Sequence, residues 1–207
     1  FAEVQGRGIQ KLRDAGIEVT VGVLEEECKR LNNRFMTYHG KHRPFVTLKW
    51  AESADGYIDG HISNAYTQML CHKRRAEHQA ILVGRHTFEK DHPSLNTRVW
   101  YGHSPKPYVV SSQSLELPEN FHLLYSKDIP CILNQLYKDG IQTVLVEGGA
   151  KLLQSFMDSG LWDECYVEKG SSIISGSVKA PVLSTDAHLV SVEHCFGQQV
   201  SKYFNKK

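Results

Sequence analysis

The stretch ILVGRHTFEKDHPSLNTR, residues 81–98, constrains the fold more than any other part of the chain. Its first three residues form an apolar run that ends at Gly84, which predicts a buried strand. Polar and charged residues follow, among them Thr87, Asp91 and Arg98, and we interpret this part as a loop at the carboxyl end of the strand. A short, uniformly apolar strand of this kind is typical of a parallel sheet that is covered on both faces.

Other segments of the chain alternate between apolar runs and helical spacing. Helices are predicted at residues 65–79, 132–138 and 150–159. Strands are predicted at residues 44–53, 107–112, 141–149 and 163–168, and a terminal β pair at residues 190–206. This order predicts an α/β fold with a mainly parallel central sheet, helices on both faces and an antiparallel C-terminal β pair.

The N-terminal part of the chain has a pattern of its own. Helical spacing at residues 8–15 and 24–35 encloses an alternating, strand-like segment at residues 17–23. Residues 39–43 are polar and basic and stop at Pro44, which is typical of a linker. We therefore predict a connecting segment at residues 1–43 and one main domain at residues 44–207.

Composition and charge exclude several classes of protein. The 24 basic and 23 acidic side chains give a net charge of +1, so no general attraction to nucleic acid is expected. No apolar stretch approaches the roughly 18 residues of a membrane span, and residues 1–3 do not begin a signal peptide. The five cysteines are scattered and form no CxxC pair, which indicates neither a disulfide framework nor a metal site. We expect a cytoplasmic protein with reduced thiols.

The ends of the predicted strands are the places to look for a binding site, because ligands of α/β sheets collect at the carboxyl edge. Lys49 lies within a core strand, where a lysine is rarely buried without a partner. Glu147 ends another strand and is followed by Gly148 and Gly149, which open a helix whose free N–H groups favour a phosphate. A simple tight turn explains the two glycines equally well. No GxGxxG fingerprint follows a strand, so a dinucleotide would bind by another scheme.

Three motifs together carry a family resemblance: TLKWAESADGYI at residues 47–58, the stretch at residues 81–98, and VLVEGGAKLL at residues 144–153. Residues 44–204 resemble the reductase domain of the bifunctional riboflavin-biosynthesis deaminase/reductase. The resemblance implies a dihydrofolate-reductase-like fold and NADPH as the cofactor. It also implies reduction of 5-amino-6-(5-phosphoribosylamino)uracil by hydride transfer to C1′ of the ribose, which yields 5-amino-6-(5-phosphoribitylamino)uracil.

The same resemblance has consequences for the rest of the molecule. Residues 6–35 look like the tail of the deaminase domain, but the zinc signature of that domain, H-x-E with P-C-x-x-C, is missing. A deaminase domain is therefore expected in the full-length protein. A homodimer is implied as well, with the C-terminal β pair as a candidate contact.

The resemblance also assigns roles to individual residues. The residues that match substrate-binding positions are Arg75, Leu95, Arg98 and Glu147. The residues that match cofactor-binding positions are Thr87, Asp91, Ser112, Gly149, Ala150, Lys151 and Leu152. Lys49 and Glu147 are the catalytic candidates, with Lys49 placed to polarise the opened ribose. The proton donor stays open between Glu147, Lys49 and a bound water.

Several alternatives remain open. Thr87 and Asp91 are also suited to capping turns, and the KRRAEH run around Arg75 is typical of a solvated helix face. The segments near Gly60 and Tyr125 are shorter than in the family pattern, and the segment near Gly170 differs from it in sequence. A dihydropteridine-type reductase of the same fold and a non-catalytic module are the alternative functions.

Overall fold

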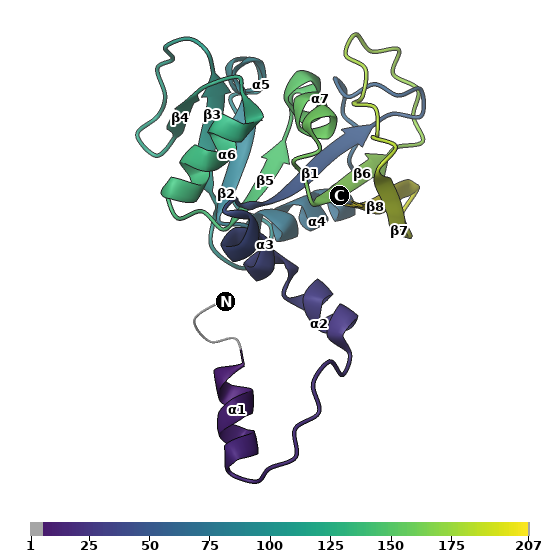
Figure 1. Cartoon of the computed structure of the whole chain (residues 1–207). Helices are drawn as coiled ribbons and strands as arrows, with labels where there is room; N and C mark the ends of the chain where they lie inside the picture. Colours follow the sequence, from purple (N-terminus) through teal and green to yellow (C-terminus); the bar gives the residue numbers. More distant parts are fainter. Residues whose placement is uncertain (1–5, 207) are drawn as a thin grey trace.

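The computed structural model describes residues 6–206 and contains one mixed sheet with helices on both sides (Figure 1). The strands are β1 (Phe45–Glu52), β2 (Ala80–Gly84), β3 (Lys106–Ser111), β4 (His122–Tyr125), β5 (Thr143–Glu147), β6 (Glu164–Lys169), β7 (Ala187–Cys195) and β8 (Gln198–Asn205). The helices are α1 (Arg7–Asp14), α2 (Glu25–Leu31), α3 (Asn33–Lys41), α4 (Ala65–Ala76), α5 (Arg85–Asp91), α6 (Ile129–Lys138) and α7 (Ala150–Ser159).

The eight strands lie in the order β4-β3-β2-β5-β1-β6-β8-β7. Strands β1 to β6 are all parallel to one another, whereas β8 is antiparallel to both β6 and β7. The predicted mainly parallel sheet with an antiparallel C-terminal pair is therefore confirmed. The strands β1 and β5 lie at the centre, so their carboxyl ends are flanked by ordered structure on both sides.

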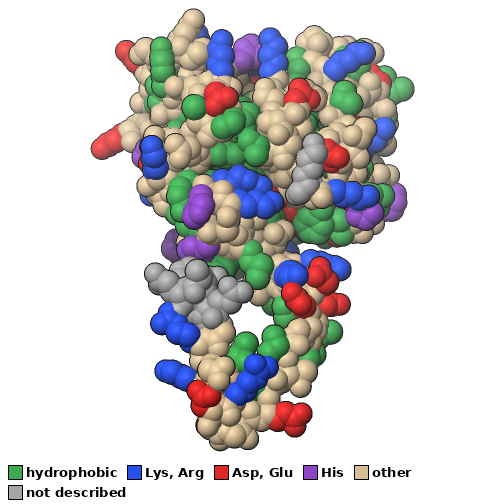
Figure 2. All heavy atoms as spheres, viewed as in Figure 1, with side chains coloured by type: hydrophobic (Ala, Val, Ile, Leu, Met, Phe, Trp, Pro, Cys, Tyr) green, Lys and Arg blue, Asp and Glu red, His purple; other side chains and the backbone are tan. Residues whose placement is uncertain are grey.

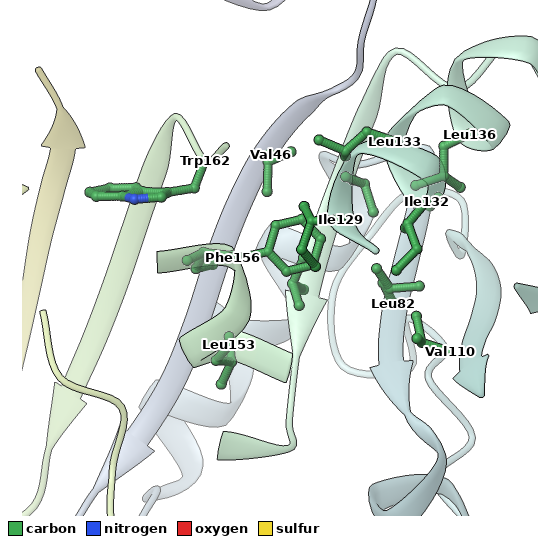
Figure 3. Close-up of a cluster of buried hydrophobic side chains, with 14 of the residues drawn as sticks. Val46, Leu82, Val110, Ile129, Ile132, Leu133, Leu136, Leu153, Phe156 and Trp162 are labelled. Carbon is green, nitrogen blue, oxygen red and sulfur yellow. The ribbon is translucent and has the colours of Figure 1, made fainter. Parts of the chain in front are cut away.

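One face of the sheet is apolar and packs against α6 and α7. Alternate residues of the strands, such as Val46 and Leu82, meet Ile132 of α6 and Phe156 of α7 in this layer (Figure 3). Burying one large apolar side chain stabilises a fold by about 1.5–3 kcal/mol. Trp162 is fully buried in the same layer and packs against its apolar side chains.

The opposite face of the sheet is polar where α4 covers it. His78, which follows α4, contacts the Thr47 hydroxyl through Nε2 at 2.9 Å, and the Arg74 guanidinium lies 4.0 Å from the centre of the Tyr166 ring. Burial lowers the pKa of His78 to about 4, so its imidazole is neutral at physiological pH. Helix α4 is thus held against β1 and β6 by directional polar contacts.

The N-terminal arm departs from the sequence-based prediction. The predicted strand at residues 17–23 is wrong: no strand lies beside this segment, and Val21 and Val23 are 61% and 67% exposed. An alternating pattern makes a strand only where a partner satisfies its backbone groups. The predicted helix at residues 24–35 is two helices, α2 and α3, and α3 continues through most of the predicted linker.

The arm extends away from the sheet and has a mixed charged and apolar surface (Figures 1 and 2). Neither α1 nor α2 contains a buried residue. Residues 1–3, on which the absence of a signal peptide was argued, lie outside the described residues. Between residues 6 and 206, no helix combines the length and apolarity needed to cross a membrane.

A buried ion pair joins the end of the arm to the sheet. Arg43 donates two hydrogen bonds to Asp163, at 2.6 and 2.8 Å, and the two side chains are only 11% and 7% exposed. Asp163 also accepts the backbone N–H of Val46 at 2.8 Å. The pair therefore locks the start of β1 to the start of β6.

Two further elements were not predicted. Residues 85–91 form α5 rather than a loop, because Phe88 gives this segment a side chain to bury against the sheet. Strand β4 is four residues long and pairs with β3 at the edge of the sheet. The helix of residues 150–159 was predicted with its exact bounds and ends at Gly160, whose φ of 66° is left-handed.

Two aspartates fasten the loop of residues 171–178 to the loop that follows β1. Asp55 accepts the backbone N–H groups of Ile174 and Ser175 at 3.2 and 2.9 Å. Asp59 accepts the N–H of Ser177 at 2.8 Å and its hydroxyl at 2.7 Å. These hydrogen bonds to the ionised form lower the pKa of Asp59 from 3.8 to about 2.

The lowered pKa of Asp59 predicts a pH-dependent contribution to stability. Because its pKa is lower in the folded state, the carboxylate stabilises the fold fully above pH 3.8, and this contribution is lost as the pH falls towards 2. Asp59→Asn is expected to be less stable than the wild type at neutral pH, by a margin that shrinks across that window. Urea unfolding of both proteins between pH 2 and pH 7 measures the margin. A margin independent of pH would contradict the prediction.

Candidate functional site

A cavity of about 330 Å³ opens at the carboxyl ends of β1 and β5. Its wall includes Lys49 and Trp50 of β1, Glu147 and Gly148 at the end of β5, and His61 and Ser63 from the segment before α4. A binding site was predicted from the sequence at this carboxyl edge of the sheet. The cavity brings the two predicted catalytic residues into one wall.

Lys49 lies on the central strand with a carboxylate on either side of it. It is the register partner of Glu147 on β5, so both side chains emerge on the same face of the sheet. On the other side, the Lys49 Nζ atom is 3.7 Å from Oε2 of Glu168 in β6. The Lys49 side chain is 13% exposed and reaches the cavity wall. A buried lysine with acidic neighbours is the expected arrangement for a charged group at a functional site.

Glu147 is held by Arg75 of α4. The Arg75 Nε and Nη2 atoms donate to the two carboxylate oxygens at 3.1 and 2.6 Å, and Cys71 Sγ lies 3.3 Å from Oε1. Burial acts to raise the pKa of Glu147, but the charge and hydrogen bonds of Arg75, together with the charge of Lys49, outweigh it and hold the pKa below its ordinary value. Glu147 is therefore an ionised carboxylate at neutral pH.

Arg75 is not on a solvated helix face. Its side chain is 12% exposed, and its Nη1 atom donates to the backbone oxygen of Asn96 at 3.1 Å. The guanidinium thus links Glu147 to the segment that carries Arg98. Sequence reasoning named Arg75 and Glu147 separately as substrate residues and missed that they bind each other, because they are 72 residues apart along the chain.

The segment after α5 presents Arg98 but buries Leu95. Arg98 is exposed, and its Nη1 atom donates to Ser94 Oγ and Asn96 Oδ1, both at 3.2 Å. Leu95 is 3% exposed, packs with Ile81 and other residues of a second apolar cluster, and has a φ of 49°. Its side chain therefore belongs to the core, which leaves its backbone for contact with a ligand.

The two predicted cofactor motifs lie against each other. Thr87, in the first turn of α5, lies so close to the paired glycines that a Cβ atom at Gly148 would stand 2.9 Å from its Cγ2 atom. A Cβ atom at Gly149 would stand 3.2 Å from the Thr87 hydroxyl. Both glycines have positive φ, 75° and 79°. The N-cap of α5 is Gly84, so Thr87 does not cap this helix.

The remaining predicted cofactor residues are spread along the same edge. Ala150 and Leu152 are half-buried in the first turn of α7, next to Gly149, and Lys151 is exposed there. Ser112 is exposed just after β3. Asp91 is the last residue of α5, about 10 Å along the helix from Gly84 at the usual rise per residue. Thr87 and Gly149 therefore share one small region, and Asp91 lies about 6 Å beyond Thr87, one turn along the same face of α5.

No function was predicted from the sequence for Glu168 and Ser63, two residues of the site. Glu168 is a buried acid on β6, and its Oε2 atom accepts a hydrogen bond from Ser63 at 2.7 Å. The available signal was the pattern DECYVE, which places Glu164, Tyr166 and Glu168 on one face of a strand. Within residues 6–206, no group of three or more potential ligands is arranged to hold a metal ion.

Comparison with known proteins connects this geometry to a family. The model of the family described as the RibD C-terminal domain matches residues 44–195. The riboflavin biosynthesis protein RibD of Aquifex aeolicus (strain VF5) is 31% identical over 201 residues, a match that covers 79% of this chain and 56% of the relative. The chain thus spans a little over half the length of that curated relative.

Solved structures give the same result for the fold. A crystal structure from Thermotoga maritima, of a diaminohydroxyphosphoribosylaminopyrimidine deaminase/5-amino-6-(5-phosphoribosylamino)uracil reductase, has a TM-score of 0.85 and 28% identity. The match covers 98% of this chain and 68% of that one. Dihydrofolate reductase from Enterococcus faecalis, complexed with NADP(H) and a second compound, has a TM-score of 0.62 at 16% identity and covers 79% of this chain and 97% of that one. The predicted dihydrofolate-reductase-like fold is confirmed.

Proposed function

The chain belongs to the RibD C-terminal domain family, and from this premise we propose that it reduces 5-amino-6-(5-phosphoribosylamino)uracil to 5-amino-6-(5-phosphoribitylamino)uracil with NADPH. The observation that carries the proposal is the pairing of Lys49 with the ionised Glu147 in the wall of one cavity. The Thermotoga maritima protein, which is named for this reductase activity, shares the fold at 28% identity.

The edge between α5 and α7 is the proposed place for NADPH, which supplies a hydride. Gly148 and Gly149 have no Cβ atoms, so a phosphate can approach the backbone closely. The free N–H groups of the first turn of α7 and the Thr87 hydroxyl are suited to bind it. Asp91, Ser112, Ala150, Lys151 and Leu152 are retained as further cofactor contacts.

The cavity next to this edge is the proposed place for the substrate. Hydride transfer to C1′ of the ring-opened imine, with a proton to its nitrogen, completes the reduction. Lys49 is proposed to polarise the opened ribose, and Glu147 to bind a ribose hydroxyl as a carboxylate acceptor. The low pKa of Glu147 favours Lys49 or a bound water over Glu147 as the proton donor. Arg75 orients Glu147, and Arg98 is proposed to bind the substrate phosphate.

A direct assay tests the proposed function. The protein is mixed with NADPH and the phosphoribosylamino substrate, and loss of the reduced nicotinamide absorbance is followed together with formation of the ribitylamino product. We expect NADPH oxidation that depends on this substrate. Saturable NADPH binding without turnover would favour a different reductase of the same fold. No NADPH binding at all would favour a non-catalytic module.

The glycine pair gives a prediction on cofactor affinity. Gly149→Ala is expected to weaken NADPH binding by roughly tenfold, about 1.4 kcal/mol, because the new methyl group approaches the Thr87 hydroxyl and blocks close approach of a phosphate to the backbone. Titration followed by nicotinamide fluorescence measures the Kd. The matched control is Gly140→Ala, also at positive φ but after α6, which is expected to leave the Kd unchanged. Equal Kd values for wild type and Gly149→Ala would contradict the prediction.

The wider organisation of the protein is proposed as well. We propose a connecting segment at residues 1–43, a reductase domain at residues 44–207, and a deaminase domain elsewhere in the full-length protein. The exposed apolar side chains of the arm, Val21, Val23 and Leu24, are suited to pack against such a domain. A cytoplasmic location is proposed on the five free cysteines.

A homodimer is proposed through the edge strand β7. This strand ends the sheet and exposes Leu189, Val190 and Val192, so its backbone and apolar side chains are open to a second copy. Val192→Lys is expected to convert the dimer to a monomer, because a buried lysine without a partner is strongly unfavourable. Sedimentation equilibrium measures the mass. A wild-type monomer, or a dimer that persists in the variant, would contradict this arrangement.

A further inference from the structure

Glu168 is a buried acid that the proposed reaction does not yet use. It is 2% exposed, lies on β6 beside the cavity-lining strand β1, and faces α4. Its Oε2 atom accepts the Ser63 hydroxyl at 2.7 Å and is 3.7 Å from the Nζ atom of Lys49. Its Oε1 atom is buried and has no hydrogen-bond partner among residues 6–206. A buried carboxylate with one unsatisfied oxygen is costly, so a compensating role is expected.

A second acid on the same strand shows what an ordinary structural pair looks like here. Glu164 lies four residues earlier on the same face and forms an ion pair with Lys202 at 3.1 Å. Its other oxygen is 3.3 Å from the Tyr166 hydroxyl. Both oxygens of Glu164 are thus engaged, and neither Glu164 nor Lys202 lines the cavity. Glu168 does not line the cavity either, but both of its partners, Lys49 and Ser63, do, and its Oε1 atom has no partner among residues 6–206.

The geometry of the Lys49–Glu168 pair leaves the lysine free to act. Charge-assisted N–H···O bonds are about 2.7–2.9 Å long, so the 3.7 Å separation is an attraction without a hydrogen bond. The donors of Lys49 therefore remain available to a ligand in the cavity. Ser63, by contrast, fixes Glu168 with a short hydrogen bond. The Glu168 carboxylate is therefore fixed in position, whereas the Lys49 ammonium group forms no hydrogen bond with it.

Lys49 lies between two opposing carboxylates. Glu147 on β5 attracts it from one side, and Glu168 on β6 from the other. Without Glu168, the attraction of Glu147, the partner of Arg75, acts on the lysine without a counterweight from β6. The lysine would then leave the reacting centre and weaken the Arg75–Glu147 contact.

We propose that Glu168 is a positioning residue that holds Lys49 at the cavity wall during hydride transfer, with Ser63 fixing its carboxylate. This inference rests on the proposed function. It adds a residue that acts through Lys49 and does not itself touch the substrate. Since a displacement of about 1 Å at a reacting group can cost roughly 100-fold in rate, loss of the positioning charge affects turnover more than binding.

The test compares Glu168→Gln with the matched variant Glu164→Gln. Glu168→Gln keeps the side-chain shape and the contact with Ser63 and removes only the charge. Its kcat is expected to fall by roughly 10- to 100-fold, while the Kd for NADPH stays at the wild-type value. Glu164→Gln, which removes another buried charge from the same strand face, is expected to retain wild-type kcat. Circular dichroism and urea unfolding confirm that each variant is folded.

A double substitution separates positioning from a general structural effect. In the Lys49→Met background, Glu168→Gln is expected to have no further effect on kcat, because the residue that it positions is gone. Ser63→Ala leaves both charges in place. It is expected to lower kcat as well, but by a smaller factor than Glu168→Gln does. If Glu168→Gln does not fold, Ser63→Ala and its combination with Lys49→Met provide the same comparison.

The outcomes distinguish the inference from the function on which it rests. A wild-type protein that does not reduce the substrate would overturn the proposed function. An active wild type with unchanged kcat in both Glu168→Gln and Ser63→Ala would overturn the positioning role alone. Equal losses in Glu168→Gln and Glu164→Gln, or a full further loss in the Lys49→Met background, would overturn it too.

Discussion

Replacing Lys49 with methionine is expected to lower kcat by roughly 10²- to 10⁴-fold, the range for loss of a positioned proton-transferring or charge-stabilising group. Methionine keeps the length and apolar stem of the side chain but removes the donors and the charge at the cavity wall. The Kd for NADPH is expected to stay near its wild-type value, because the proposed cofactor edge lies between α5 and α7. Steady-state kinetics at saturating NADPH and a separate fluorescence titration measure the two quantities.

The control for this substitution is a lysine outside the cavity. Lys169 lies at the end of β6, is exposed, and does not line the cavity. Lys169→Met is expected to retain wild-type kcat. A Lys49→Met protein with near-wild-type turnover would contradict the assignment of the site. It would also mean that a group other than Lys49 donates the proton.

The largest expected effect on stability comes from the pair at the start of β1. Asp163→Asn is expected to lower the free energy of unfolding by about 3–5 kcal/mol, the usual cost of removing one partner from a buried ion pair. The Arg43 guanidinium is left in a site that is 11% exposed without its counter-charge. The asparagine still has an oxygen to accept the N–H of Val46, so the effect reports mainly on the charge. Urea unfolding at neutral pH measures it.

An exposed arginine–carboxylate pair provides the comparison. Arg85 and Glu89 form an ion pair at 2.7 Å on α5, with side chains 40% and 39% exposed. Glu89→Gln is expected to change stability little, because water already screens the pair. Equal effects of Asp163→Asn and Glu89→Gln would mean that the Arg43–Asp163 pair does not anchor the start of the sheet.

The middle of the sheet was predictable from its apolar residues. Strands β2 and β5 carry nearly uniform apolar runs and are buried on both faces, and such runs leave few alternatives. Strand β4 was missed because it has only four residues, of which one is fully buried. The error at residues 17–23 has the opposite cause, since the pattern was present and the partner strand was not.

Which residues form the site could be predicted from the sequence, but the contacts among them could not. Lys49 and Glu147 were identified by their type and their place in a strand, and the structure makes them register partners. The hydrogen bonds of Arg75 to Glu147 and of Ser63 to Glu168 join residues 72 and 105 positions apart. No local pattern encodes such contacts. Leu95 shows the same limit, because its burial depends on how the segment after α5 folds back on the sheet.

The two faces of the sheet have different consequences for the evolution of this protein. On the face covered by α6 and α7, an apolar residue of similar volume can replace another, so substitutions can accumulate there one at a time. On the face covered by α4, each group depends on a particular partner, as Glu147 does on Arg75. Changes there have to occur in pairs. Homologues of this protein are therefore expected to diverge freely where α6 and α7 cover the sheet and to covary where α4 covers it.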